Sequence, residues 1–268
     1  MANRSRWLLA FTALCFVAVF VVPAIPQPLG YHQFADQRRA LGIANFFDVA
    51  SNVGFLVAGL AGLIIVWGDR ARLEFARERW PWTVFFAGLL LTAIGSSYYH
   101  LAPDNERLFW DRLPMTIAFA GLVASQIVDR VSVRAGIASL VPLLVAGAAS
   151  VIYWRWTERM GAGNLVPYGI LQGYAVAVLL FLAVAEHSRY TRGNDLYWIF
   201  GWYVLGKLFE TFDEPVFALG HVASGHTLKH LAAAGSGFVA CFMLMHRTLR
   251  AHRGPLAAAR DRSRPAQA

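Results

Sequence analysis

Long runs of apolar residues, separated by short polar connections, recur along the whole chain. A helix needs roughly 20 mostly apolar residues to cross the hydrocarbon core of a membrane. Eight runs approach this length, and each predicts a membrane-spanning helix. No stretch alternates apolar and polar residues as a membrane barrel would, and no segment repeats at a fixed period. The runs are residues 7–25, 46–67, 80–99, 113–128, 135–153, 165–184, 196–212 and 231–245, the last completed by residues 226–230.

The apolar pattern divides the chain into three parts. Residues 1–26 are predicted to form an N-terminal transmembrane helix or signal anchor, retained because no small-x-small cleavage pattern ends its apolar run. Residues 27–246 carry the other seven helices, with connections too short to hold a soluble domain. Residues 247–268, rich in Arg, Ala and Pro, are expected to be a basic, disordered cytoplasmic tail. The fold class is therefore all-α, a polytopic transmembrane bundle of seven core helices and one extra helix.

Composition supports a membrane protein and narrows the chemistry. Hydrophobic residues make up 57% of the chain and charged residues 15%, whereas soluble domains have about 25% charged residues. Both cysteines, Cys15 and Cys241, lie inside apolar runs, which rules out a disulfide framework or a cysteine-based zinc site. Any metal must therefore be held by histidine or carboxylate. The net charge of +8 is spread over short loops and the C-terminus, and this scatter argues against nucleic acid as a partner.

The distribution of basic residues predicts the orientation. With eight spans both termini lie on one side of the membrane, and that side carries sixteen arginines against six on the other. Short loops rich in Lys and Arg stay in the cytoplasm. We therefore expect a multi-pass protein of a bacterial inner membrane with both termini cytoplasmic. The connections that follow the first, third, fifth and seventh runs then face outward.

Ionisable side chains gather at the outward-facing ends of three helices. Such residues are costly in a membrane and are functional candidates by default. Ser96 and His100 lie four residues apart at the end of one helix, and therefore on one face. Asp111 lies across the next hairpin, while His226 and His230 open the last helix, again one turn apart. Three histidines and an aspartate are thus expected at one membrane depth.

Two histidines one turn apart and a third from another helix suit an open zinc site, whose fourth position is left for water. Zinc lowers the pKa of that water from about 15.7 towards about 7. The motif HTLKH (residues 226–230) lacks the Glu of the soluble metalloprotease motif. Asp111 is therefore the candidate base, and Ser96 is a candidate donor to the metal-bound oxygen or to a developing oxyanion. Two other interpretations remain open: histidines that only meet lipid head groups, and a haem site that would leave Asp111 unused.

The order and spacing of these motifs resemble the alkaline ceramidase family of intramembrane zinc amidases, whose wider superfamily includes the progestin and adiponectin receptors. The likeness covers about 200 residues and treats the first run as an addition to a seven-helix, ceramidase-like core. Bacterial members look particularly similar in the stretches SGHTLKHLAAA (residues 224–234) and IANFFDVASN (residues 43–52). The motifs that carry the likeness are Ser96-x-x-x-His100, Asp111 eleven residues later, and His226-x-x-x-His230.

The resemblance implies a role for each residue. His100, His226 and His230 would bind Zn²⁺, Asp111 would shuttle protons, and Ser96 would stabilise the oxyanion or position the water. The implied activity is that of an amidohydrolase acting on linear amides, which cleaves a ceramide-like N-acyl membrane lipid into a fatty acid and a sphingoid base.

Calcium is a point of departure from that family. Eukaryotic members bind calcium through acidic residues near the start of the first core helix, including a Glu where this chain has Asn45. Here only Asp36 closely precedes that helix, beside Arg38 and Arg39. The sequence therefore does not favour a calcium site.

Further polar residues lie near the predicted site. Asn45, Asp48 and Asn52 share one helix face, which favours interhelical hydrogen bonds over support of a metal ligand. Glu210, Asp213 and Glu214 near the HTLKH motif either orient a histidine, bind a cationic head group or remain solvated. Lys229 is expected to project away from the His226/His230 face and to snorkel to water. Tyr168 and Gln172, one turn apart, are candidates for contact with a lipid amide.

Three functions remain open on this pattern. The first is a zinc-dependent lipid amide hydrolase. The second is a lipid esterase or phospholipase on the same site, because both reactions attack a carbonyl group. The third is a non-enzymatic receptor or structural membrane protein whose metal holds helices together. An open fourth metal position beside Asp111 favours catalysis, whereas a fourth protein ligand would favour a structural site.

Overall fold

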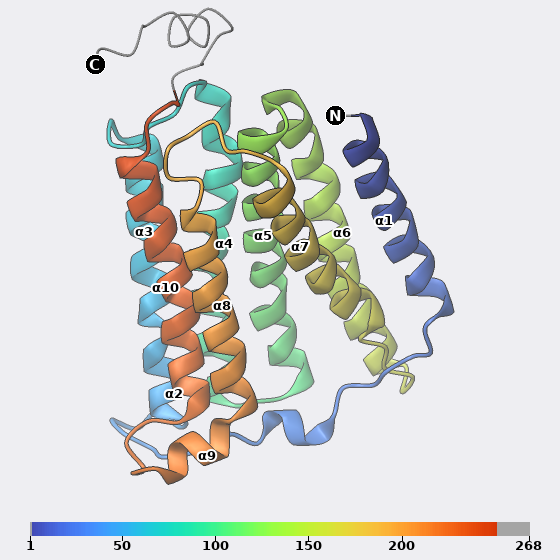
Figure 1. Ribbon diagram of the computed structural model, residues 1–268. Coiled ribbons are helices and arrows are strands. Elements are labelled where there is room, and N and C mark those ends of the chain that lie inside the picture. Colours follow the sequence, from blue (N-terminus) through green and yellow to red (C-terminus); the bar gives the residue numbers. More distant parts are fainter. Residues whose placement is uncertain (1, 251–268) are drawn as a thin grey trace, which may run out of the picture.

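The computed structural model describes residues 2–250, with residues 2–5 described by their backbone alone. They form a bundle of long helices joined by short connections (Figure 1). Each of the eight predicted runs is mainly helical, although the first extends four residues beyond the end of α1, so the helical bundle expected from the sequence is confirmed. The helices are α1 (Ala2–Val21), η1 (Leu29–His32), α2 (Phe46–Ser51), α3 (Val53–Trp67), η2 (Ala76–Glu78), α4 (Arg79–Leu101), α5 (Asn105–Arg130), α6 (Val133–Arg159), α7 (Val166–Ala185), α8 (Asp195–Thr211), α9 (Asp213–Ala218) and α10 (Gly225–His246).

Five helical stretches of the described chain are long and apolar enough to cross a membrane. One is α2 together with α3, another is η2 together with α4, and the others are α6, α7 and α10. This length and composition fit a multi-pass membrane protein.

The remaining three predicted runs are helical but do not reach the same threshold. Helix α8 has 17 residues, and the described apolar part of α1, Arg6–Val21, is also short. Helix α5 has 26 residues but carries polar side chains such as Gln126 and Asp129, both buried. Because α5 packs against α4, α6 and α7, much of its surface faces protein. It therefore needs less lipid-facing apolar surface than an outer helix.

The contacts between helices show which of them are neighbours in the bundle. Helix α4 packs between α3 and α5, and α10 packs against α3 and α8. Helix α1 lies at the outside of the bundle against α7, where Phe11 stacks on Tyr174 with ring centroids 5.8 Å apart. The start of α1 and the end of α10 lie at one end of the bundle, whereas η1, α9 and the start of α10 lie at the other (Figure 1).

The expected disordered tail from residue 247 is wrong for its first four residues. The Arg247 side chain is 2% exposed, donates to the backbone oxygen of Arg72 at 2.8 Å, and approaches Glu78 at 3.5 Å. Its guanidinium also lies 3.8 Å from the centroid of the Tyr190 ring. A buried arginine is stable here because a carboxylate, a carbonyl and an aromatic face surround it. Residues 251–268, the rest of that expected tail, lie outside the described residues.

Candidate metal centre

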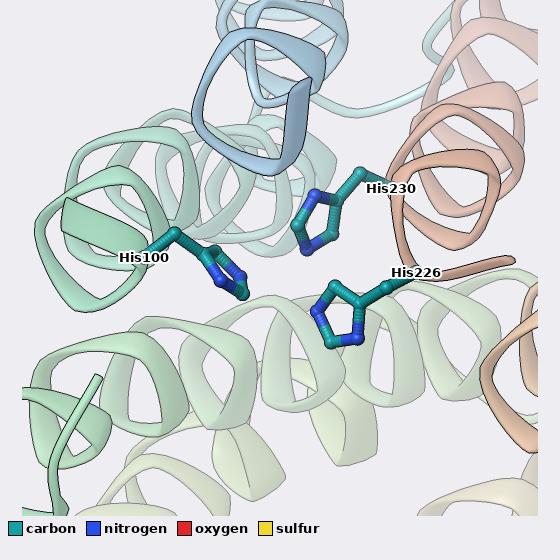
Figure 2. Close-up of side chains that lie close together, drawn as sticks. All are labelled: His100, His226 and His230. Carbon is teal, nitrogen blue, oxygen red and sulfur yellow. The ribbon is translucent and has the colours of Figure 1, made fainter. Parts of the chain in front are cut away.

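Three histidine rings meet at the end of the bundle that carries η1 and α9. His100 comes from the last turns of α4, and His226 and His230 come from the first turns of α10. All three are buried, and their ring centroids lie 4.8 to 4.9 Å apart. Figure 2 shows the rings turned toward one another from the two helices. One nitrogen of each ring lies within 4.8 Å of the others, so that the three could hold one metal ion.

The geometry and chemistry of this group fit zinc. A tetrahedral ion with Zn–N bonds of roughly 2.0–2.1 Å separates its ligand nitrogens by about 3.4 Å. Small side-chain rotations would therefore close the three nitrogens around an ion. Among the described residues this group comprises histidines alone, and three imidazoles leave a fourth position without a protein ligand. This arrangement is compatible with an open zinc site.

The start of α10 explains how two ligands come to share one face. Ser224 caps the helix, because its hydroxyl accepts a hydrogen bond from the Thr227 amide at 3.0 Å. The carboxylate of Asp213 accepts from the His226 amide at 2.7 Å. These acceptors satisfy amides that lack partners in the first turn of a helix. They fix the start of α10, so that His226 and His230 lie one turn apart.

A serine that the sequence analysis missed orients His230. Nδ1 of His230 lies 2.8 Å from Oγ of Ser51, and this hydroxyl donates to the backbone oxygen of Asp48 at 3.0 Å. Because the hydroxyl proton is used on Asp48, its oxygen accepts the N–H of His230. This assignment places the imidazole proton on Nδ1 and leaves the lone pair of Nε2 for a metal. The only sequence signal for Ser51 was its place within the polar turn of residues 45–52.

His100 carries a polar atom that the protein leaves without a partner. Its Nδ1 is buried and makes no hydrogen bond within the described residues. An unsatisfied buried group costs about 1–3 kcal/mol, and coordination of an ion by the ring would relieve such a cost. Phe34 covers the cluster, with ring centroids 4.7 Å from His100 and 4.4 Å from His226. This cover was not anticipated from the sequence, because Phe34 lies in an irregular connection.

Lys229 occupies a different position from the one expected. It does not snorkel away from the histidines: its Nζ lies 2.9 Å from Nε2 of His226 and 3.2 Å from the carboxylate of Glu210. An ammonium can only donate, so Nε2 of His226 accepts, and the imidazole proton is on Nδ1. A metal on either nitrogen of His226 would displace this hydrogen bond. The expectation failed because Glu210, on α8, attracts Lys229 inward.

Asp111 and Ser96 meet beside the cluster. The Ser96 hydroxyl hydrogen-bonds the Asp111 carboxylate. A Cβ atom on the neighbouring Gly95 would lie 1.9 Å from the backbone oxygen of Trp110, so the absence of a side chain there lets α4 and α5 approach closely. Asp111 lies inside α5, which begins at Asn105, whereas the sequence predicted a helix that begins only at residue 113, just after Asp111. The helix starts early because Asp104 caps it by accepting from the Arg107 amide at 2.7 Å.

A cavity of about 360 Å³ adjoins these residues. Helices α4, α5, α7, α8 and α10 all contribute to its wall. Most of the wall is apolar, and its size lies within the range of ligand pockets. Polar residues are also among its lining: Ser96, Asp111, Arg112, Tyr168, Gln172, Lys207, Glu210, Lys229 and His230. The site therefore joins a polar, metal-competent group to space for an apolar chain.

The polar face of α2 makes the expected interhelical hydrogen bonds. Asp48 accepts from the Thr227 hydroxyl at 2.7 Å, and Asn45 donates to the backbone oxygen of His100 at 2.9 Å. Asn52 instead donates to the backbone oxygen of Asp48 at 2.8 Å. The first two bonds tie α2 to both helices that carry the histidines. They therefore help to hold the cluster together.

The acidic residues near the motif have distinct roles. Glu210 pairs with Lys229 and with Lys207, and Asp213 accepts from the amides of His226 and Ala35. Glu214 is exposed. The first two thus orient the site, whereas Glu214 has the solvated position that the sequence left open.

Asp36, the acidic residue nearest before α2, is buried and faces Arg38. Arg38 donates to its two carboxylate oxygens at 2.8 and 2.6 Å. Burial disfavours the charged carboxylate, but the hydrogen bonds and charge of Arg38 hold its pKa below the usual value. Its oxygens are thus engaged by an arginine, which competes with any cation.

No known protein-family model and no curated protein matches this chain.

Proposed function

We propose that this protein is a zinc-dependent intramembrane hydrolase that cleaves the amide bond of a ceramide-like N-acyl lipid into a fatty acid and a sphingoid base. The observation that carries the proposal is the group of three buried histidines with Asp111 and Ser96 beside it, next to a largely apolar cavity. The motif spacing that resembles the alkaline ceramidase family supports the same conclusion. His100, His226 and His230 are the proposed ligands.

The chain's own residues suit amide hydrolysis. When bound, zinc polarises a carbonyl group and lowers the pKa of water. Asp111 would accept a proton from the attacking water and return it to the amine that leaves. Ser96, which hydrogen-bonds Asp111, would donate to the oxygen of the attacked carbonyl. A preorganised donor of this kind typically contributes about 10²–10³-fold to the rate.

The form of the site favours catalysis on a lipid over a purely structural metal. The ligand group contains three protein residues, which leaves room for water and substrate. The apolar wall of the cavity suits an acyl chain, and α7 and α8 both contribute to it. A structural zinc would be closed by a fourth protein ligand. The same features would also serve a lipid esterase or phospholipase.

The decisive experiment is product analysis on a panel of lipids. The full-length protein, purified with zinc, is incubated with ceramides, N-acyl amino lipids and phospholipids, and products are identified by mass spectrometry. We expect release of fatty acid and sphingoid base from ceramide-like amides, and none from the His226→Ala variant. Release of fatty acid from ester lipids alone would show that the enzyme is an esterase and not an amidase. Zinc binding with no release from any lipid would favour the receptor.

A further inference from the structure

A buried arginine beside the proposed catalytic group forms no ion pair within 4.0 Å among residues 2–250. Arg112 is 5% exposed, and its side chain contributes to the wall of the cavity next to Asp111. Nη2 donates to the side-chain oxygen of Gln27 at 2.6 Å, whereas Nη1 is buried and makes no hydrogen bond in the described part of the chain. Arg112 is one of the six arginines that the charge count assigned to the outward-facing side. The structure instead places Arg112 within α5, which begins seven residues earlier, and its side chain is buried.

Other arginines buried in the bundle are compensated differently. Arg247 approaches Glu78 at 3.5 Å, and Arg130 approaches Asp129 at 4.0 Å. No carboxylate lies within 4.0 Å of the Arg112 guanidinium among residues 2–250. The neighbouring Asp111 interacts with Arg112 only through its charge at a longer distance, and its hydrogen bond is made with Ser96. Buried charges in proteins are normally paired. Arg112 is therefore an exception that a ligand would explain.

Three aromatic rings surround this charge. The guanidinium carbon lies 4.4 Å from the ring centroid of Trp154, 5.1 Å from Tyr168 and 5.3 Å from Tyr31. Their faces stabilise a cation and fix the plane of the guanidinium. The rings do not accept a hydrogen bond from Nη1, so within the described chain this buried nitrogen keeps an unused donor.

A second donor lies at the same place. Nε2 of Gln172 donates to the Tyr168 hydroxyl at 2.7 Å. Since this oxygen accepts from Gln172, the phenol keeps its own proton for another acceptor. Tyr31, Arg112, Tyr168 and Gln172 all line the cavity. Tyr168 and Gln172, which were expected to contact a lipid, therefore lie beside the positive charge of Arg112.

We infer that Arg112 and Tyr168 bind an anionic group, a carboxylate or a phosphate, at the head of an amphipathic substrate. The location supports this assignment. Tyr31 and Gln27 belong to the connection before α2, at the end of the bundle where a lipid head group would lie, and Asp111 precedes Arg112 on the same helix turn. A lipid with its head at Arg112 would place its nearby amide by Asp111 and its chain in the apolar cavity. This inference rests on the proposed function and predicts that, among ceramide-like N-acyl lipids, those with an anionic head are preferred over neutral ones.

The test compares lipids that differ only in the head. The zinc-loaded, full-length protein in detergent micelles is titrated at low temperature with N-oleoylglycine, N-oleoylethanolamine phosphate and neutral N-oleoylethanolamine. We expect the carboxylate, the phosphate or both to bind at least tenfold more tightly than the neutral lipid. Whichever anion is preferred identifies the group. Equal affinities for all three lipids would overturn the inference without recourse to any variant.

Variants then assign the preference to a residue. Arg112→Gln should bind the anionic and neutral lipids equally, while Arg112→Lys should keep part of the preference. Arg155→Gln is the matched control, because Arg155 also lies over an aromatic ring, that of Phe109, but is paired with Glu106 outside the cavity lining. It should retain the full preference. A preference that survives in folded Arg112→Gln would refute the assignment; if that variant does not fold, the wild-type comparison decides.

Hydrolysis in the same samples separates this inference from the proposed function. Tighter binding of anionic lipids with no cleavage of any lipid would support the anionic binding site and refute the hydrolase function. Cleavage of all three lipids with equal affinity and equal KM would support the hydrolase function and refute the anionic subsite.

Discussion

Replacing Ser51 by Ala should weaken zinc binding by about 10- to 100-fold while the bundle stays folded. The Ser51 hydroxyl links Nδ1 of His230, at 2.8 Å, to the backbone oxygen of Asp48, at 3.0 Å. That oxygen also accepts from Asn52 at 2.8 Å, so Asp48 keeps a partner in the variant. The loss therefore falls on His230, whose ring loses its side-chain partner and keeps only its hydrogen bond to the backbone of Asp48.

The magnitude follows from that single buried donor. An unsatisfied buried polar group costs about 1–3 kcal/mol, and each factor of ten in affinity corresponds to about 1.4 kcal/mol. Loss of a partner that orients a metal-binding histidine typically lowers affinity by about 10–100-fold, which agrees with this range. The Ala variant also frees the ring to rotate and to place its proton on Nε2, the nitrogen assigned to the metal.

The assay is a zinc competition titration against a chelator, with purified full-length protein in detergent. Ser97→Ala is the control, because its hydroxyl makes only a long 3.5 Å hydrogen bond to the backbone oxygen of Val49. It should bind zinc as the wild type does. Thermal melting must show that both variants are folded. The reasoning would be refuted by a folded Ser51→Ala protein whose zinc affinity lies within twofold of the wild type.

Four further predictions concern the same site and its orientation. The protein should contain about one zinc per chain, and the His100→Ala, His226→Ala double variant should contain none by elemental analysis; full occupancy there would show that the three-histidine site is wrong. Asp111→Asn should keep its zinc and lose about 10²–10⁴-fold in activity, because it removes a general base; parallel loss of zinc would instead make Asp111 a ligand. Lys229→Met should raise zinc affinity about tenfold or more in the chelator assay, since the ammonium competes for His226, and a fall in affinity would contradict that competition. A reporter fused after residue 268 should be cytoplasmic and one placed between α9 and α10 should be external, whereas the reverse result would overturn the charge-based orientation.

The helices could be predicted because each depends mainly on its own segment. Apolar runs near 20 residues long specify spans whatever lies beside them, and residues 46–67 are helical over the predicted bounds apart from the break between α2 and α3. The pairing of His226 with His230 was also predictable, because residues four apart share a helix face. The convergence of His100 on this pair followed from the alternating direction of successive spans.

The errors arose where side chains reach across to another helix. The periodicity of α10 puts Lys229 off the face of the histidines, but its long side chain bends to Glu210 on α8. A basic residue near a predicted loop reads as a topology signal, yet Asp104 starts α5 early and turns Arg112 into the bundle. Helix boundaries and side-chain partners of this kind are set by capping and packing, and the hydropathy of a segment does not report either.

The sequence by itself determined the membrane class, the succession of helices and the residue types able to hold a metal, since these depend on local composition and spacing. Only the tertiary structure decided that Ser51 orients His230, that Phe34 covers the cluster and that Arg112 is buried without a carboxylate partner among the described residues. Those contacts join segments far apart in the chain. Their geometry depends on how whole helices pack, and no single segment encodes it.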